Sequence, residues 1–176
     1  GTSDASKSWF AIGEYKLLPN EVGGMETTKP EEVKQAMKML IKQYYNTKPI
    51  TFETILDFHQ KFESIHPFQD GNGRVGRLIM FKECLAHNIV PFIITDEIKM
   101  YYYRGLHEWL RTPGYLIDTC LTAQDNYKAL LRYFKVKYSI SWLLIFCPSL
   151  WGLLPLSCCE VQNLRRTRGR CENKRK

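Results

Sequence analysis

Residues 66–77 read His-Pro-Phe-Gln-Asp-Gly-Asn-Gly-Arg-Val-Gly-Arg, and together they carry a base, a carboxylate, a glycine-flanked turn and two arginines. His66 has an ordinary pKa near neutrality and could take a proton from an incoming hydroxyl group. Asp70 would repel a phosphate bound nearby unless a cation lay between them, and Mg²⁺ is the natural bridging ion. This combination predicts phosphoryl or nucleotidyl transfer.

The turn Gly71-Asn72-Gly73 is typical of an anion-binding loop. Glycine tolerates positive φ and has no side chain to block close approach, so successive N–H groups can point at a phosphate. A helical pattern resumes at Arg74, which places the turn at a helix N-terminus, where the helix dipole favours negative charge. Arg74 and Arg77 are three residues apart and share a helix face, so both could bind the same anion. Each feature also has an ordinary structural explanation, but their order within twelve residues favours the functional one.

Five helical segments are expected to hold this loop. The second of them should end at His66, because the following proline disfavours the right-handed helical conformation there. His59 lies on its apolar side and is predicted to be buried and hydrogen-bonded, and Phe68 should turn inward and fix the loop. Thr95 or Asp96 can cap the fourth segment. From their apolar periodicity, the segments are residues 30–45, 52–65, 74–88, 98–111 and 118–136.

A small hairpin is expected ahead of the first helix. Within residues 13–24, a strand-like run meets the turn signal Pro19-Asn20 and returns through Val22 to Gly23 and Gly24. The pattern alone indicates an ordinary N-terminal hairpin.

Residues 66–77 resemble the signature of Fic-domain proteins, H-x-F-x-[D/E]-G-N-G-R-x-x-R, at every specified position. The order of elements from about Gly13 to Val136 is also similar to that family. The resemblance implies an all-α fold, a Fic-type helical bundle with a small β-hairpin flap near the N-terminus. It divides the chain into an extension or expression remnant (residues 1–12), a Fic-type catalytic domain (13–136) and an atypical tail (137–176).

The resemblance also implies a reaction. Similar Fic proteins transfer AMP from ATP to a hydroxyl side chain of a target protein and release pyrophosphate. In that role His66 would deprotonate the Ser, Thr or Tyr hydroxyl, and Asp70 would bind Mg²⁺ between the α- and β-phosphates. Transfer of UMP or GMP, removal of AMP, and a non-catalytic nucleotide-binding interaction module are the alternatives.

The remaining residues of the signature are implied to bind phosphates. Gly71, Asn72 and Gly73 would cradle them, with Asn72 stabilising charge on the α-phosphate. Arg74 would hold the outer phosphates, and Arg77 would support the γ-phosphate. The related kinase-like branch departs from the Gly-Asn-Gly-Arg pattern, which favours nucleotidyl transfer for this chain.

Three consecutive tyrosines, Tyr101 to Tyr103, exceed what packing requires. A flat aromatic ring is a good platform for a nucleotide base. The resemblance implies an adenine pocket at this part of the fold, which makes Tyr102 and Tyr103 candidates. Simple packing is the alternative for either residue.

Two kinds of partner follow from the resemblance. A target protein would add a strand along the flap, from about Gly13 to Gly24. Many similar proteins also carry an inhibitory helix, [S/T]-x-x-x-E-[G/N], whose glutamate pairs with the arginine corresponding to Arg77. No segment of the sequence fits this pattern. An inhibitory region ahead of Gly1, a separate antitoxin-like protein that supplies the glutamate, and constitutive activity all stay open.

The net charge of +7 belongs mainly to the tail, because residues 137–176 hold eight Lys/Arg and two Asp/Glu. The rest of the chain is nearly neutral, so no specific nucleic-acid partner is expected. The apolar run 142–156 is interrupted and shorter than the roughly 20 residues of a membrane span, which predicts no transmembrane segment. An interaction segment, a membrane-surface anchor and out-of-frame sequence are open interpretations of the tail, and we favour the last.

The 176 residues, 44% of them hydrophobic, suffice for one globular domain. No signal peptide or C-x-x-C pair is visible, which favours a cytoplasmic protein with reduced thiols and disfavours structural zinc.

Overall fold

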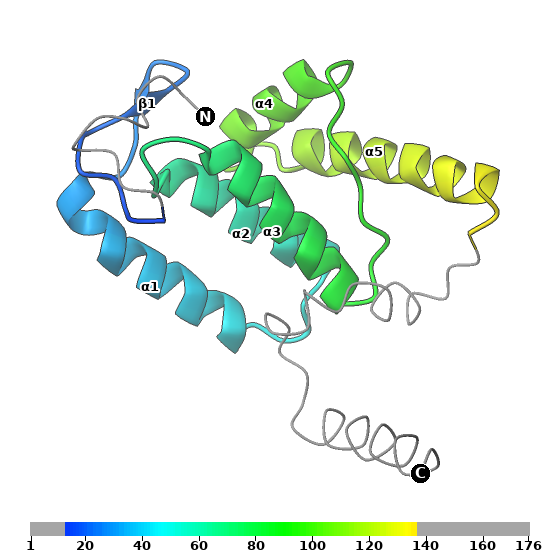
Figure 1. Cartoon of the computed structure of the whole chain (residues 1–176), viewed down its shortest axis with the longest axis horizontal. Coiled ribbons are helices and arrows are strands. Elements are labelled where there is room, and N and C mark those ends of the chain that lie inside the picture. Colours follow the sequence, from blue (N-terminus) through cyan, green and yellow to red (C-terminus); the bar gives the residue numbers. More distant parts are fainter. Residues whose placement is uncertain (1–12, 137–176) are drawn as a thin grey trace, which may run out of the picture.

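The computed structural model describes residues 13–136, which are helical apart from one short hairpin (Figure 1). The predicted all-α fold class with a small hairpin is therefore confirmed. The expectations for residues 1–12 and 137–176 lie outside the described residues. In chain order the elements are β1 (Glu21–Val22), β2 (Met25–Glu26), α1 (Pro30–Asn46), α2 (Phe52–Ile65), α3 (Asn72–Ala86), α4 (Lys99–Glu108) and α5 (Gly114–Tyr133).

The hairpin turns at a different place from the one predicted. Glu21 pairs with Glu26 and Val22 with Met25, so the turn consists of the two glycines between the strands. Their φ angles of 59° and 78° lie in the region that favours glycine. Pro19-Asn20 precedes β1 and does not form the turn. Every strand residue is exposed, so the strands stand on the surface of the protein.

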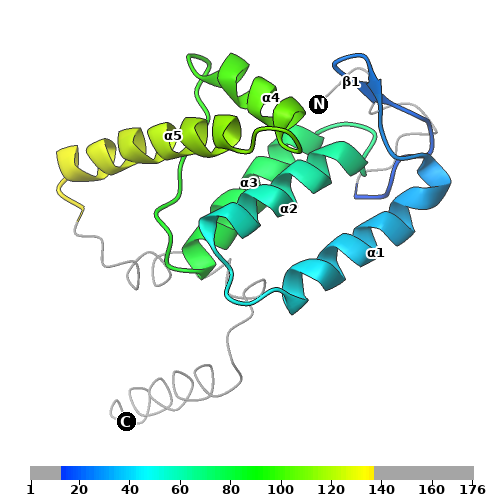
Figure 2. The same cartoon turned by 180° about the vertical axis from the view of Figure 1, so that it is seen from behind.

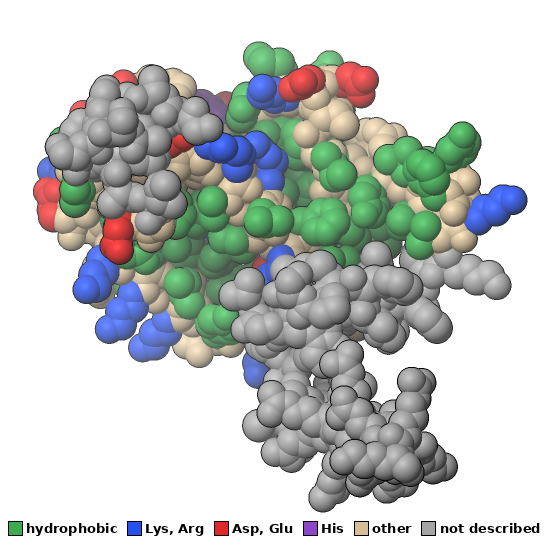
Figure 3. All heavy atoms as spheres, viewed as in Figure 1, with side chains coloured by type: hydrophobic (Ala, Val, Ile, Leu, Met, Phe, Trp, Pro, Cys, Tyr) green, Lys and Arg blue, Asp and Glu red, His purple; other side chains and the backbone are tan. Residues whose placement is uncertain are grey.

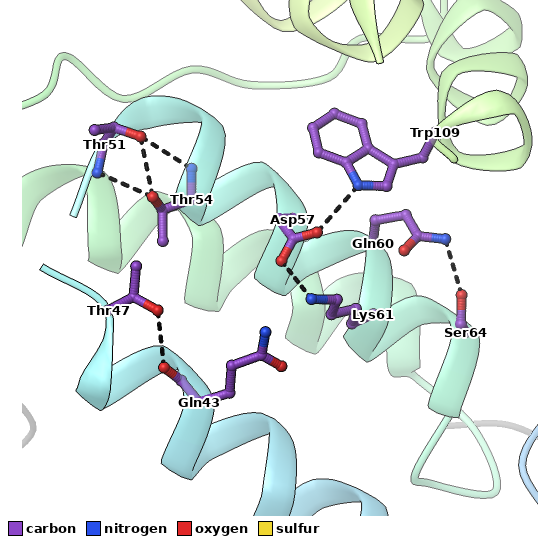
Figure 4. A network of polar contacts seen from close by, with 9 residues as sticks. All are labelled: Gln43, Thr47, Thr51, Thr54, Asp57, Gln60, Lys61, Ser64 and Trp109. Carbon is purple, nitrogen blue, oxygen red and sulfur yellow. Dashed lines mark hydrogen bonds and ion pairs between the residues drawn. The ribbon is translucent and has the colours of Figure 1, made fainter. Parts of the chain in front are cut away.

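The start of α2 is fixed by its own side chains. The Thr51 hydroxyl accepts a hydrogen bond from the Thr54 N–H at 3.2 Å, and the Thr54 hydroxyl accepts one from the Thr51 N–H at 3.3 Å (Figure 4). This reciprocal pair satisfies donors that have no acceptor within the helix. On the same helix, Asp57 accepts from Lys61 at 2.7 Å and from the indole N–H of Trp109 at 3.2 Å, which ties α2 to the end of α4.

Two helix starts differ from the prediction. α4 begins after Ile98 and has no side-chain cap, so the predicted cap at Thr95 or Asp96 is wrong. α5 begins at Gly114, ahead of the predicted start at Asp118. The Pro113-Gly114 pair had indicated a break, but proline is also favoured at a helix start because the first N–H groups lack partners there. Here Pro113 precedes the first turn of α5 and leads into it.

α2 is the central helix and contacts α1, α3 and α5 (Figures 1 and 2). One hydrophobic cluster joins α2 to α3, α4 and α5, and its buried members include Leu56, Met80, Tyr102 and Leu116. A second cluster joins α1 to α2 and includes Val33, Met37, Leu40 and Phe62, against which Phe68, Val75 and Ile79 pack. The second cluster therefore packs against the loop between α2 and α3 through Phe68 and against the start of α3 through Val75.

The surface shown in Figure 3 carries Lys and Arg side chains along the outer side of α1 and hydrophobic side chains over α3 and α5. The α1 lysines Lys34, Lys38 and Lys42 are exposed at a spacing of four residues, which places them on one helix face. Within residues 13–136, no helix combines the length and hydrophobicity that a bilayer span requires.

Candidate active site

His66 ends α2 outside the right-handed helical region, as predicted. Its φ and ψ are 51° and 62°, in the left-handed region. For a residue other than glycine, this conformation costs about 1–2 kcal/mol. Surrounding contacts must therefore hold the backbone of His66 in place.

The ring of His66 has one nitrogen available for chemistry. Nδ1 lies 3.3 Å from the carbonyl oxygen of Glu63, and because a carbonyl only accepts, Nδ1–H is the donor and Nε2 is unprotonated in the neutral ring. Burial has the largest effect on the pKa of His66 and lowers it. The charge of Lys16 lowers it further, while the Glu63 carbonyl and the charge of Asp70 raise it. The ring is therefore mostly neutral at pH 7 and can accept a proton.

Asn72 closes the loop between α2 and α3. Its amide nitrogen donates to the Phe68 carbonyl at 2.7 Å, and its amide oxygen accepts from the Phe68 N–H at 2.7 Å. The residue is 1% exposed. Both polar atoms of its side chain are thus bonded within the loop. The α-phosphate contact predicted for Asn72 would therefore be made by its backbone N–H, which lies in the first turn of α3.

Phe68 is partly buried and packs as predicted. Its ring stacks on Tyr15, at a centroid distance of 6.2 Å, and lies 6.3 Å from the ring of Phe62. The aromatic contacts hold the side chain while the Asn72 amide holds the backbone.

The N-terminus of α3 has the form of an anion site. Gly71 is its N-cap, with a φ of 82°, and the Val75 N–H is the first to bond back within the helix, to the Gly71 carbonyl at 2.9 Å. The N–H groups of Asn72, Gly73 and Arg74 have no acceptor inside the helix. Gly73 itself is helical, so of the two glycines only Gly71 has a positive φ. The three N–H groups and the helix dipole together favour a bound phosphate.

The two arginines lie close to the glycines of this turn. A Cβ built on Gly73 would be 3.1 Å from Nη1 of Arg77, and one on Gly71 would be 3.3 Å from Nη2 of Arg74. A side chain at Gly73 would therefore require the guanidinium of Arg77 to shift by a few tenths of an ångström from the helix end. Arg74 is 72% exposed and can move toward a ligand.

Asp70 is well placed for a metal that arrives with phosphates. Its Oδ1 accepts from the Gly71 N–H at 2.6 Å and its Oδ2 accepts from Arg74 at 3.1 Å. In the part of the chain that the structure describes, no three His, Cys, Asp or Glu residues cluster as a metal site. Mg²⁺ commonly binds through one or two carboxylates together with substrate phosphates, so a single partly exposed carboxylate fits that mode.

The two candidate tyrosines have different environments. Tyr102 is 1% exposed, and its hydroxyl lies 2.5 Å from Nε2 of His59. Its burial argues against the predicted role as a platform for a nucleotide base. Tyr103 is 46% exposed, so that role stays a prediction for Tyr103. The expectation that His59 is buried and hydrogen-bonded is confirmed. The helical recurrence of Ile98, Tyr102 and Trp109 was a signal for this burial.

Two residues beside the site were not singled out from the sequence. Glu63 lies one helical turn before His66, and burial raises its pKa to about 7 although the charge of Arg77 opposes this. Its position three residues before His66 could have indicated from the sequence that the two side chains lie close together. Lys16 is 2% exposed, and its pKa is lowered by burial. Nothing local in the sequence marks this lysine as buried.

Known proteins share both the motif and the fold. The model of the Fic/DOC family matches residues 2–84. Protein adenylyltransferase fic-1 of Caenorhabditis elegans is 30% identical over 98 residues, which is 54% of this chain and 19% of that protein. Protein adenylyltransferase fic-1 of Caenorhabditis briggsae is 39% identical over 98 residues, with the same coverage of 54% and 19%. The matched segment thus spans about a fifth of the length of these curated relatives.

A solved structure supports the same assignment. A Fic domain containing signaling protein from Bacteroides thetaiotaomicron has a TM-score of 0.53 and 27% sequence identity, over 72% of this chain and 51% of that chain. The helical bundle with a small hairpin is therefore of the Fic type, as the motif implied. The family match over residues 2–84, the complete signature at the start of α3 and this structural likeness together show a Fic-type domain in this chain.

Proposed function

We propose that this protein is an adenylyltransferase that moves AMP from ATP to a Ser, Thr or Tyr hydroxyl of a target protein and releases pyrophosphate. The observation that carries the proposal is the pairing of a neutral histidine with an anion site in one short loop. His66 keeps Nε2 available because Nδ1 is engaged by the Glu63 carbonyl. The first turn of α3 and the guanidinium of Arg77 supply donors for phosphate a few residues away.

In the proposed reaction, Nε2 of His66 takes the proton of the target hydroxyl. The oxygen forms a bond to the α-phosphorus, the bond from that phosphorus to the oxygen bridging to the β-phosphate breaks, and pyrophosphate leaves. The N–H groups of Asn72 and Gly73 would bind phosphate oxygens, and Arg74 and Arg77 the outer phosphates. Mg²⁺ held by Asp70 would neutralise phosphate charge when bound. The Caenorhabditis relatives are named protein adenylyltransferases, which supports this class of reaction.

The location of the label decides between transfer reactions. The full chain would be incubated with Mg²⁺ and ATP labelled on either the α- or the γ-phosphate, alone to detect self-modification and with cell lysate to detect targets. We expect incorporation of the α-label only. Incorporation of the γ-label would instead show phosphorylation, and parallel reactions with UTP and GTP test the alternative donors.

Two histidine variants provide the control. His66→Ala should abolish incorporation, whereas His107→Ala, at an exposed position on α4, should leave it unchanged. Equal labelling by wild type and His66→Ala would refute the catalytic role of His66. Binding of ATP in calorimetry without transfer to any protein would favour a nucleotide-binding module, and release of AMP from a premodified protein would favour the reverse reaction.

We further propose a cytoplasmic location and two protein partners. A target loop would pair along the segment from Gly13 to Gly24 and the adjoining hairpin, whose strand residues are exposed. A glutamate from an inhibitory segment or an antitoxin-like protein would occupy Arg77 and exclude the γ-phosphate. Cross-linking through a photoreactive residue at Val22 would identify a bound target. For the second partner, replacing the glutamate that contacts Arg77 in a candidate inhibitor should increase labelling.

A further inference from the structure

Lys16 connects the segment before β1 to the end of α2. Its ammonium nitrogen lies 2.7 Å from Oδ1 of Asn20, 2.6 Å from Oγ1 of Thr27 and 3.3 Å from the carbonyl oxygen of Ile65. Its backbone N–H donates to the carbonyl of Pro67 at 2.8 Å. The carbonyl groups of the residues on both sides of His66 are therefore bonded to one lysine.

The surroundings of Lys16 are those of a specific buried cation. The residue is 2% exposed. An ammonium group has three N–H donors, and the structure provides three oxygen acceptors, so the group is fully satisfied despite its loss of solvent. A lysine that merely covered apolar surface would keep its charged end in water.

Further bonds join the same two segments. Nδ2 of Asn20 donates to the Phe68 carbonyl at 3.1 Å, and the Leu18 N–H donates to Oε1 of Gln69 at 3.1 Å. The segment from Lys16 to Asn20 is thus hydrogen-bonded to Ile65, Pro67, Phe68 and Gln69. Figures 1 and 2 place the hairpin at the end of the bundle where α2 passes into α3.

We propose that Lys16 is a positioning residue for the transfer reaction, which holds His66 in its left-handed conformation by bonding the carbonyls before and after it. The expected effect of Lys16 on catalysis rests on the proposed function, whereas its expected effect on the backbone of His66 does not. The left-handed backbone of His66 requires support from outside its own helix. Lys16 provides that support at both flanking residues, and Asn72 provides it only further along, at Phe68.

Charge gives a second way to detect the contact. The charged groups that act on the pKa of His66 are Lys16 from the hairpin segment, which lowers it, and Asp70 from the loop, which raises it. Loss of the Lys16 charge should therefore raise the pKa of His66, whereas loss of an unrelated surface lysine should not change it.

The test compares full-length Lys16→Met with Lys34→Met, a matched change at an exposed position of α1. NMR titration of the four histidine ring signals, assigned with His66→Ala, gives the pKa of His66 without any activity. We expect this pKa to rise in Lys16→Met, because the charge of Lys16 lowers it in wild type. We also expect kcat for self-labelling with ATP to fall about 10- to 100-fold, with KM for ATP within about twofold of wild type, as for a displaced catalytic group.

Thr27→Val is the milder variant if Lys16→Met does not fold. It removes one acceptor of the Lys16 ammonium with little change in shape, and it should change kcat in the same direction by a smaller factor. An unchanged His66 pKa and unchanged kcat in the folded variant would overturn the proposal. If wild type shows no transfer at all, the proposed function fails, and the NMR titration still decides whether Lys16 positions His66.

Discussion

Replacing Glu63 by glutamine should change how the stability of this protein depends on pH. The side chain of Glu63 is 14% exposed, and within residues 13–136 its Oε1 has no hydrogen-bond partner. Burial raises its pKa from 4.5 to about 7, against the opposing charge of Arg77. The folded state therefore holds this proton more tightly than the unfolded chain, so the stability linked to it is complete below pH 4.5 and is lost as the pH rises through 7.

The size of the effect follows from the shift. Each pKa unit corresponds to about 1.4 kcal/mol, so a shift from 4.5 to about 7 amounts to roughly 3 kcal/mol over the whole range. Between about pH 5 and about pH 8 the upper limit is roughly 2.5 kcal/mol. Because Glu63 retains some exposure and solvent screens its charge, we expect about 1–2 kcal/mol. Glutamine resembles the protonated acid and does not titrate, so Glu63→Gln should gain that amount relative to wild type as the pH rises.

The assay is urea unfolding of wild type and variant at both pH values, with the free energy of unfolding extrapolated to water. Other titrating groups change equally in both proteins and cancel in the difference. Glu53→Gln, at an exposed position on the same helix, is the control and should show little change with pH. Parallel pH dependence for Glu63→Gln and wild type, within about 0.5 kcal/mol, would show that Glu63 is ionised in the folded protein at neutral pH and would refute the argument.

Four further predictions follow from the geometry. Gly105→Ala should push α4 away from α5, because a Cβ at this position would lie 2.6 Å from the Leu116 Cα. Urea unfolding should show a loss of stability of about 1–3 kcal/mol. Asn72→Ala should cost about 2 kcal/mol by leaving the Phe68 N–H and carbonyl unpaired, and calorimetry should show weaker ATP binding. The acid limb of kcat/KM for self-labelling should have its midpoint below 6.5, since burial lowers the pKa of the base His66. Tyr103→Ala should raise the dissociation constant for ATP about tenfold, and an unchanged constant would exclude Tyr103 from the base site.

Much of the site was predictable because its chemistry is local in sequence. The range from His66 to Arg77 combines a helix stop, a turn and a helix start, each governed by neighbouring residues. Pro67 and the glycines locally favour the end of α2 and the start of α3. The helix limits were likewise close to the prediction in α1, whose apolar stripe follows Pro30, and in α2, whose apolar stripe runs into His66.

The errors and omissions arose where contacts between residues distant in sequence determine the local structure. Pro113-Gly114 suits either a break or a start, and packing of α5 against α4 selects the start. The side-chain bonds of Asn72 to the Phe68 backbone were not anticipated, because they form only when the loop closes. Lys16 has the sequence context of an exposed lysine, and contacts such as the one with Ile65, 49 residues away, bury it.

The position of Lys16 also separates two tasks within the hairpin region. Strands of two residues whose side chains are exposed contribute little stability of their own, so the tip around Gly23 and Gly24 is held weakly. The other end is fixed by the buried ammonium and its three acceptors. If a target pairs with the tip, as proposed, the strands would be able to shift without displacing His66. In the proposed reaction, this arrangement keeps the catalytic base in place while the hairpin adapts to the protein that carries the hydroxyl.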